Sequence, residues 1–157
     1  MKRNKELEKA VLLGNIADVK SVIKVVDEIN LIDKDGRTVL YDAIVKGYED
    51  IVIELCSAGS NVNVQDKSGK TPLHFASIHN QYSIAKILIG YGADVNTKDE
   101  NGNTPIFDAI FYSNGIPDII LLLKENRADY SSANNYGISP KELAESIANF
   151  NVAYIFD

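Results

Sequence analysis

The sequence of 157 residues contains no tryptophan, a single cysteine and only four prolines. The lone Cys56 cannot form an internal disulfide or complete a cysteine-based zinc site, so a disulfide-stapled domain and a zinc finger are excluded. The longest apolar runs, such as residues 119–123, fall far short of the roughly 18 to 20 residues that a membrane helix needs. The N-terminus also lacks a signal-peptide core with a cleavage site. These absences predict a cytoplasmic protein without a membrane anchor.

Positive charge is scarce as well. The chain has 16 Lys and Arg against 22 Asp and Glu, which gives a net charge of −6. An acidic protein has little general attraction for nucleic acid or anionic lipid, so we predict neither as a partner. Hydrophobic residues at 45% and charged residues at 24% are the proportions of a globular domain rather than of a disordered chain. The length fits one domain.

A short motif, Asp followed by Gly three residues later and Thr two residues after that, recurs along the chain. Its glycine stands at Gly36, Gly69 and Gly102, whose numbers differ by 33 each time, and a weaker copy at Gly137 follows after 35. The same interval of 33 separates four alanines, which are Ala10, Ala43, Ala76 and Ala109. Five repeated units therefore fill the chain, with two residues inserted in the fourth, within residues 113–117.

Each unit reads as a turn followed by two helices. The aspartate that opens the motif commonly bonds backbone amides of its own turn. Thr71-Pro72 and Thr104-Pro105 predict a threonine hydroxyl at the helix N-cap that accepts a bond from an orphan amide, and a proline at the first helical position, where no amide is needed. Residues 139–142 read Ser-Pro-Lys-Glu, which predicts a capping box. The second helix stops near Gly92, where a left-handed residue is easily placed.

Two segments of the third unit carry a family resemblance. Residues 69–76 read Gly-Lys-Thr-Pro-Leu-His-Phe-Ala, and residues 92–96 read Gly-Ala-Asp-Val-Asn. Both resemble the ankyrin repeat, and the similarity covers nearly the whole chain. It implies an all-α solenoid of stacked helix-turn-helix units joined by β-hairpin-like turns. The implied single domain, 1–157, comprises an N-terminal capping repeat (1–32), full repeats (33–65, 66–98 and 99–133) and a truncated C-terminal capping repeat (134–157).

Three departures from the family pattern have expected structural consequences. Tyr41 and Phe107 replace the histidine of the Thr-Pro-Leu-His motif, so we expect those repeats to be tied less tightly to their neighbours. Arg127 stands where Gly92 stands one repeat earlier. It either adopts a left-handed conformation at a cost of roughly 1–2 kcal/mol or reshapes the turn.

Residues suited to catalysis are few. The resemblance gives His74 a structural role between turns, and Cys56 lies at an apolar helix position that predicts a buried small hydrophobe. No glycine-rich phosphate loop follows a strand, and no metal-ligand spacing is present. We therefore predict no catalytic residue, no cofactor and no metal.

The resemblance implies a concave binding face built from turn tips and inner helices. On the tips the predicted partner-binding residues are Lys34, Arg37, Lys67, Lys70, Asn101, Asn103 and Tyr136. On the inner helices they are Val45, Lys46, Ile78, His79, Phe111 and Tyr112. The basic tips favour a partner with an acidic patch, although solvated charged turns explain them equally well. The apolar members are typical of interface anchors rather than of packing between repeats.

These features together predict a non-catalytic, monomeric module that binds a folded protein partner. One specific alternative is a small cytosolic inhibitor or immunity protein that neutralises a toxin or enzyme, which is an analogy with the family. An enzyme with an unrecognised site, and a nucleic-acid binder that uses the basic tips, are the less favoured interpretations.

Overall fold

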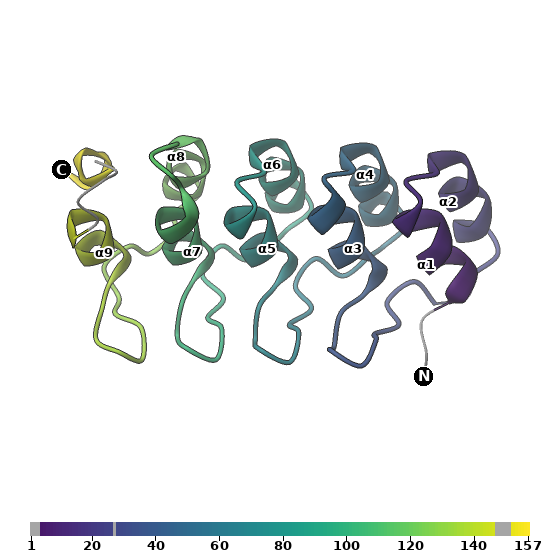
Figure 1. The fold of residues 1–157 in the computed structure, drawn as a ribbon, viewed down its shortest axis with the longest axis horizontal. Coiled ribbons are helices and arrows are strands. Elements are labelled where there is room, and N and C mark those ends of the chain that lie inside the picture. Colours follow the sequence, from purple (N-terminus) through teal and green to yellow (C-terminus); the bar gives the residue numbers. More distant parts are fainter. Residues whose placement is uncertain (1–3, 27, 147–151) are drawn as a thin grey trace.

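The computed structural model describes residues 4–26, 28–146 and 152–157. An inner row of helices comprises α1 (Lys5–Leu12), α3 (Val39–Lys46), α5 (Pro72–Ile78), α7 (Pro105–Tyr112) and α9 (Pro140–Ser146). An outer row comprises α2 (Ile16–Ile23), α4 (Glu49–Ser57), α6 (Tyr82–Gly90), α8 (Asp118–Glu125) and the 3-10 helix η1 (Ala153–Phe156). The helix pairs stand side by side, the loops between them project to one side, and the termini lie at opposite ends (Figure 1). The described residues contain no strand, as the all-α prediction requires.

Helix starts follow the predicted capping chemistry with one exception. The Thr71 hydroxyl accepts a bond from the His74 N–H at the start of α5. Ser139 and Glu142 form the expected capping box, in which the Ser139 N–H donates to the Glu142 carboxylate at 2.8 Å. The prediction for Thr104 is wrong, because this residue occupies the N-cap of α7 without making a side-chain bond there.

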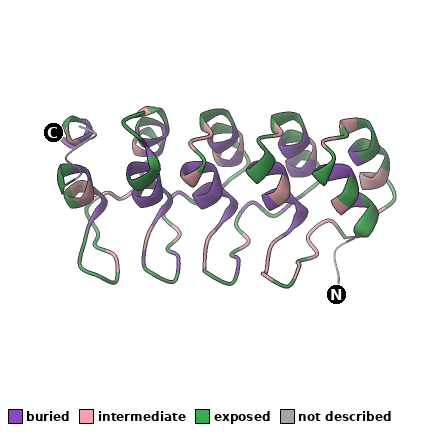
Figure 2. Cartoon of the chain, viewed as in Figure 1, coloured by how far each residue is buried: buried purple, intermediate pink, exposed green. Residues whose placement is uncertain are grey.

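The hydrophobic core runs the length of the stack, between the two rows and between successive pairs (Figure 2). Leu40, Leu73 and Ile106 occupy the same position in successive inner helices, and each is fully buried. Ala43 and Ala76, both fully buried, let neighbouring helices approach closely. A single helix pair has no partner for its apolar face, so stability depends on stacking. No helix among the described residues has the length and apolarity to cross a bilayer.

Each loop is organised by the predicted aspartate. The Oδ1 atom of Asp66 accepts hydrogen bonds from the N–H groups of both Ser68 and Lys70, at 2.9 and 3.0 Å. Asp33 and Asp99 bond the equivalent amides of their own loops. Asn134 does the same in the last loop. The recurring carboxylates are therefore local turn-forming groups, as predicted.

A ladder of asparagines joins the repeats beside the outer helices. The side chain of Asn63 donates to the Gly92 carbonyl at 3.0 Å and accepts the Asp94 N–H at 2.8 Å. Asn96 makes the same pair of bonds to the next repeat, and one of them ends on the Arg127 carbonyl at 3.2 Å. Arg127 has φ +66°, so it keeps the turn by adopting the left-handed conformation and bears the associated strain.

The C-terminal segment packs back onto the last repeats. Ile155 and Phe156 are buried, and the Phe156 ring lies 5.0 Å from the Tyr130 ring. Lys124 of α8 donates to the Ile155 carbonyl and lies 5.7 Å from the centre of the Phe156 ring. These contacts bury Ile155 and Phe156 against the last repeats, whereas Tyr154 remains exposed.

Successive loops approach each other closely enough to form backbone hydrogen bonds. The Glu100 N–H donates to the Ser68 carbonyl at 3.0 Å. Gly69 has φ +77°, and a Cβ atom there would lie 2.8 Å from the Glu100 nitrogen. Gly137 has nearly the same φ, +79°, but no other loop of the described residues stacks on it, and nothing lies within 4 Å of its Cβ position. This pair separates the effect of loop stacking from that of backbone conformation.

Replacing Gly69 by alanine is expected to lower the free energy of unfolding by about 1–2 kcal/mol more than replacing Gly137 by alanine. Both substitutions strain a left-handed residue, but only the first forces a methyl group against the backbone of the next loop. Urea denaturation of both variants measures the difference. Equal losses of stability would show that the loops do not pack as closely as described.

Candidate partner-binding surface

Two of the predicted basic tip residues form ion pairs with the following repeat. The Arg37 guanidinium donates to Asp66 Oδ2 from Nε at 2.9 Å and from a terminal nitrogen at 2.8 Å. It also lies 4.7 Å from the centre of the Phe75 ring. Burial raises the pKa of Asp66, but hydrogen bonds from Ser68 and Arg37 outweigh it and leave that pKa below its usual value. Arg37 thus contributes to the junction between repeats.

Lys70 bridges two buried carboxylates. Its Nζ atom lies 2.8 Å from Asp99 Oδ2 and 2.7 Å from Asp108 Oδ2. Burial raises the pKa of Asp108 to about 6, and the nearby ammonium only partly opposes this effect. Burial lowers the pKa of Lys70, but its hydrogen bonds to Asp108 and Asp99 outweigh this and raise it overall. The charge of Lys70 is neutralised inside the protein, whereas Lys34 and Lys67 are exposed.

His74 joins two repeats as a neutral imidazole. Its Nδ1 atom accepts the Thr71 N–H at 3.0 Å, and its Nε2 atom lies 3.1 Å from the Asn103 carbonyl oxygen, to which it donates. Protonation at Nδ1 would break the first bond. Burial accordingly lowers the pKa of His74 to about 4. The geometry supports the structural role rather than a catalytic one.

The expectation that Tyr41 holds its repeat less tightly to the next repeat is wrong. Its hydroxyl bonds the carbonyl oxygen of Val64 and, at 2.9 Å, that of Lys70 in the next repeat. The tyrosine therefore replaces the bond that histidine makes one repeat later. Phe107 occupies the same position without a polar group and contributes only packing, with 8% of its surface exposed.

An apolar row runs across the inner helices on the side that also carries Arg37. This inner-helix stripe consists of Leu12, Val45, Ile78 and Phe111, one residue from each of α1, α3, α5 and α7. The exposed fractions are 45% for Leu12, 46% for Val45 and 59% for Phe111, whereas Ile78 is half-buried. Leu12 is not among the partner-binding residues predicted from the sequence. It precedes Val45 by one repeat interval, and this spacing could have identified it as the equivalent position of the first unit.

Aromatic side chains extend the stripe at its C-terminal end. The rings of Phe111 and Tyr112 lie 4.9 Å apart, edge to face, and Tyr112 is 43% exposed. Tyr136, at the tip of the last loop, is 71% exposed, and its hydroxyl lies 3.1 Å from Asn101 Oδ1. These rings are thus available to a partner.

The remaining predicted site residues differ in their exposure to solvent and in their hydrogen bonds. Lys46 and His79 are exposed at the ends of α3 and α5. Asn101 is also exposed. Asn103 is half-buried, and its side-chain oxygen accepts a bond from Asn134 at 2.8 Å while its carbonyl holds His74. Asn103 is therefore better placed to support the loops than to contact a partner.

A depression of about 160 Å³ lies on this surface between the first three inner helices. Its lining residues are Leu12, Arg37, Tyr41, Asp42, Val45, Lys46 and Phe75. Pockets for small-molecule ligands are commonly about 300 Å³ or larger. The depression is better suited to one anchoring side chain of a protein partner than to a cofactor.

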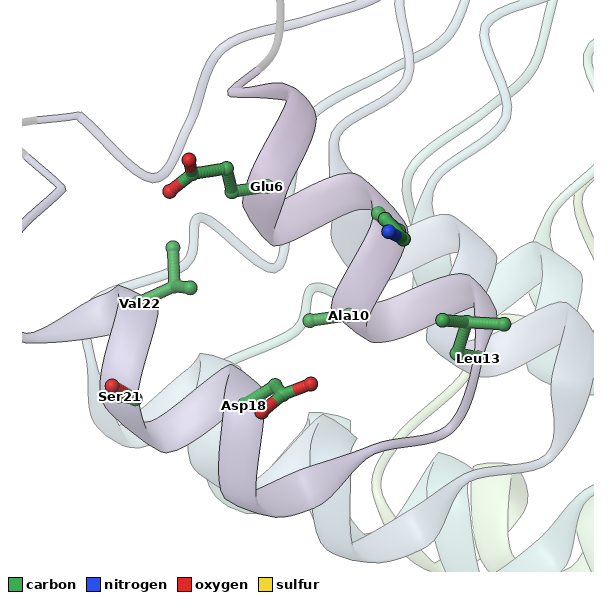
Figure 3. A pocket seen from close by; sticks show the side chains of 7 residues that line it. Glu6, Ala10, Leu13, Asp18, Ser21 and Val22 are labelled. Atoms are coloured by element: carbon green, nitrogen blue, oxygen red, sulfur yellow. The ribbon is translucent and has the colours of Figure 1, made fainter.

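A second groove, of about 230 Å³, lies between α1 and α2 at the N-terminal end of the stack (Figure 3). Asp18 lines this groove. The residues at the equivalent position of the next two repeats, Ile51 and Ile84, are apolar and buried in the core. Glu6 likewise occupies the position of Val39. Polar residues at these positions are expected of a terminal repeat whose outer face meets water. This groove is therefore not our candidate for the partner site.

The stacked helix pairs, with loops that bond one another along one side, define an α-helical repeat solenoid. A family model described as ankyrin repeats (3 copies) matches residues 7–99 and 58–134. The chain belongs to the ankyrin-repeat family. Ankyrin repeats are generally modules for protein–protein interaction and are typically non-catalytic. No curated protein shows significant similarity to the chain.

Proposed function

We propose that the protein binds a folded protein partner in the cytoplasm through the surface formed by its loops and inner helices. The supporting observation is the inner-helix stripe, because three of its four apolar side chains are between 45% and 59% exposed and stand at equivalent positions of successive inner helices. Exposed apolar clusters of this kind mark interfaces. A rigid stack presents them with little entropy cost on binding. Within the single domain, residues 1–32 and 134–157 act as capping repeats.

The partner carries an acidic patch opposite the N-terminal half of this surface. Lys34, Lys46 and Lys67 are exposed there. Positive charge on this face contrasts with the net charge of −6 for the whole chain. Such complementarity accelerates association and disfavours wrong partners. The binding itself is the output, and a monomeric inhibitor of a toxin or enzyme is the specific role that we consider alongside scaffolding.

Changing Phe111 and Tyr112 to alanine is expected to weaken partner binding by at least about tenfold, since aromatic anchors each contribute about 2 kcal/mol or more. Helical content and the thermal midpoint should remain near those of the wild type, because both rings are exposed. Affinity capture from the native host, followed by titration of the captured protein, measures the first effect, and circular dichroism measures the second.

A matched control comes from the outer helices. Ile53 of α4 and Leu121 of α8 are 44% and 39% exposed, and their replacement by alanine should leave partner binding unchanged. Equal losses of binding in the two double variants would contradict the proposed surface. Unfolding of the Phe111 and Tyr112 variant would show that these rings belong to the core.

A further inference from the structure

Asparagine followed by glycine is the dipeptide most prone to lose its side-chain amide in water. Glycine has no Cβ atom, so its backbone nitrogen approaches the side-chain carbonyl of the asparagine more freely than that of any other residue. The sequence contains this dipeptide twice, at Asn101-Gly102 and at Asn114-Gly115. Because both asparagines are exposed, the hydrogen bonds around each dipeptide decide which of them reacts in the folded protein.

The first dipeptide is held by its own loop and by the loop that stacks on it. The Gly102 N–H donates to the Asp99 carbonyl at 2.9 Å, and Gly102 is buried. The backbone carbonyl of Asn101 accepts the Asn135 N–H at 2.9 Å, and its side-chain oxygen accepts the Tyr136 hydroxyl at 3.1 Å. Bonds within this loop and to the next loop must therefore break before the Gly102 nitrogen can reach the Asn101 side chain.

The second dipeptide forms a tight turn between α7 and α8. Asn114 and Gly115 have φ of +48° and +84°, and the Ile116 N–H donates to the Ser113 carbonyl at 2.9 Å, as in a type I′ turn. Such a turn favours Asn-Gly because both central residues are left-handed. The Gly115 N–H makes only a long bond, of 3.3 Å, to the Ser113 hydroxyl. Within the described part of the chain the Asn114 side chain has no hydrogen bond, and both residues of the dipeptide are exposed.

We propose that Asn114 is a site of spontaneous deamidation in the folded protein and that Asn101 is protected from the same reaction. The Gly115 nitrogen loses its proton to solvent and bonds to the Cγ atom of Asn114, and the Cγ–Nδ2 bond breaks with release of ammonia. Water then opens the resulting cyclic imide at either carbonyl, which leaves aspartate or isoaspartate at position 114. Water is the only co-reactant, and no atom is oxidised or reduced.

The reaction changes the surface at the aromatic end of the inner-helix stripe. Either product adds a negative charge close after Phe111 and Tyr112, in a chain whose net charge is already −6. The isoaspartate product also adds a methylene group to the backbone of the turn, within the inserted residues 113–117. Because Asn114 and Gly115 are exposed, the helical circular dichroism of the modified protein should remain that of the unmodified protein.

The test incubates the full chain in mildly alkaline buffer and follows the product at each asparagine with time. Cleavage before Asp108 places Asn101 and Asn114 on separate peptides, whose masses report the exchange of the side-chain NH2 group for OH. In the folded protein Asn114 should react at least about tenfold faster than Asn101, because the loop around Asn101 must first open. In urea, where both dipeptides are released, the two rates should agree within about threefold. An assay for isoaspartate distinguishes the imide route from direct hydrolysis, which yields aspartate alone.

Two variants assign the product to its residue. Asn114→Gln should remove the early product, because glutamine must close a larger ring and reacts much more slowly. The matched Asn101→Gln variant changes the other dipeptide in the same way and should leave the rate of the early product unchanged. Equal or faster reaction at Asn101 in the folded protein would overturn the inference. Reaction of Asn114 in urea alone, or a product without isoaspartate, would overturn it as well.

Discussion

Replacing Lys70 by methionine is expected to lower the free energy of unfolding by about 3–5 kcal/mol. The side chains of Asp99 and Asp108 are 0% and 6% exposed, and the Lys70 ammonium contacts both of them. Removing one partner of a buried ion pair leaves charge without compensation, which costs far more than losing a surface pair. Urea denaturation followed by circular dichroism measures the loss.

Two further variants isolate the cause of that loss. Lys67→Met, at an exposed position three residues away, should change the stability by less than about 0.5 kcal/mol. Adding Asp108→Asn to Lys70→Met should restore part of the stability, because one of the two stranded carboxylates disappears. A cost below about 1 kcal/mol for Lys70→Met would contradict the buried network.

Lowering the pH is expected to change the free energy of unfolding in opposite directions through His74 and Asp108. The pKa of His74 falls from 6.5 to about 4 on folding, so the unfolded chain binds its proton first and stability is lost as the pH falls below about 6.5. The pKa of Asp108 rises from 3.8 to about 6, so the folded protein binds that proton first and stability is gained as the pH falls below about 6. The two contributions oppose each other in the wild type.

Single substitutions should expose each contribution. Between pH 7 and pH 4.5, the Asp108→Asn variant is expected to lose about 2 kcal/mol more stability than the wild type, because only the histidine contribution remains. The His74→Gln variant should lose about 2 kcal/mol less than the wild type over the same range. Groups common to all three proteins cancel in this comparison. Denaturation curves at both pH values measure the changes, and parallel behaviour of the three proteins would contradict the assignment.

The fold was predictable because its signals are local. The recurring turn motif, the turn aspartates such as Asp66 and the capping box of Ser139 and Glu142 reflect bonds within one repeat. A residue type and a short spacing suffice to specify such bonds. Thr104 shows the limit, since a hydroxyl at the N-cap position does not guarantee that the bond forms.

The candidate binding surface was only partly predictable because exposure depends on neighbours distant in sequence. Lys67 and Lys70 are alike in sequence context, yet Lys70 meets Asp99 and Asp108, which are 29 and 38 residues further along the chain. Leu12 becomes part of a continuous apolar row only when α1 stacks beside α3. The repeat pattern places equivalent positions in register, but it does not state which charges pair.

The amino-acid sequence by itself determined the repeated turn-helix-helix unit and the family, because turn and cap chemistry act over a few residues. Tertiary structure alone decided which lysines remain exposed, why Asp108 and His74 have shifted pKa values, and where the apolar row is uncovered. Those properties depend on burial and on distances between adjacent repeats. Such distances are fixed only when the helix pairs stack.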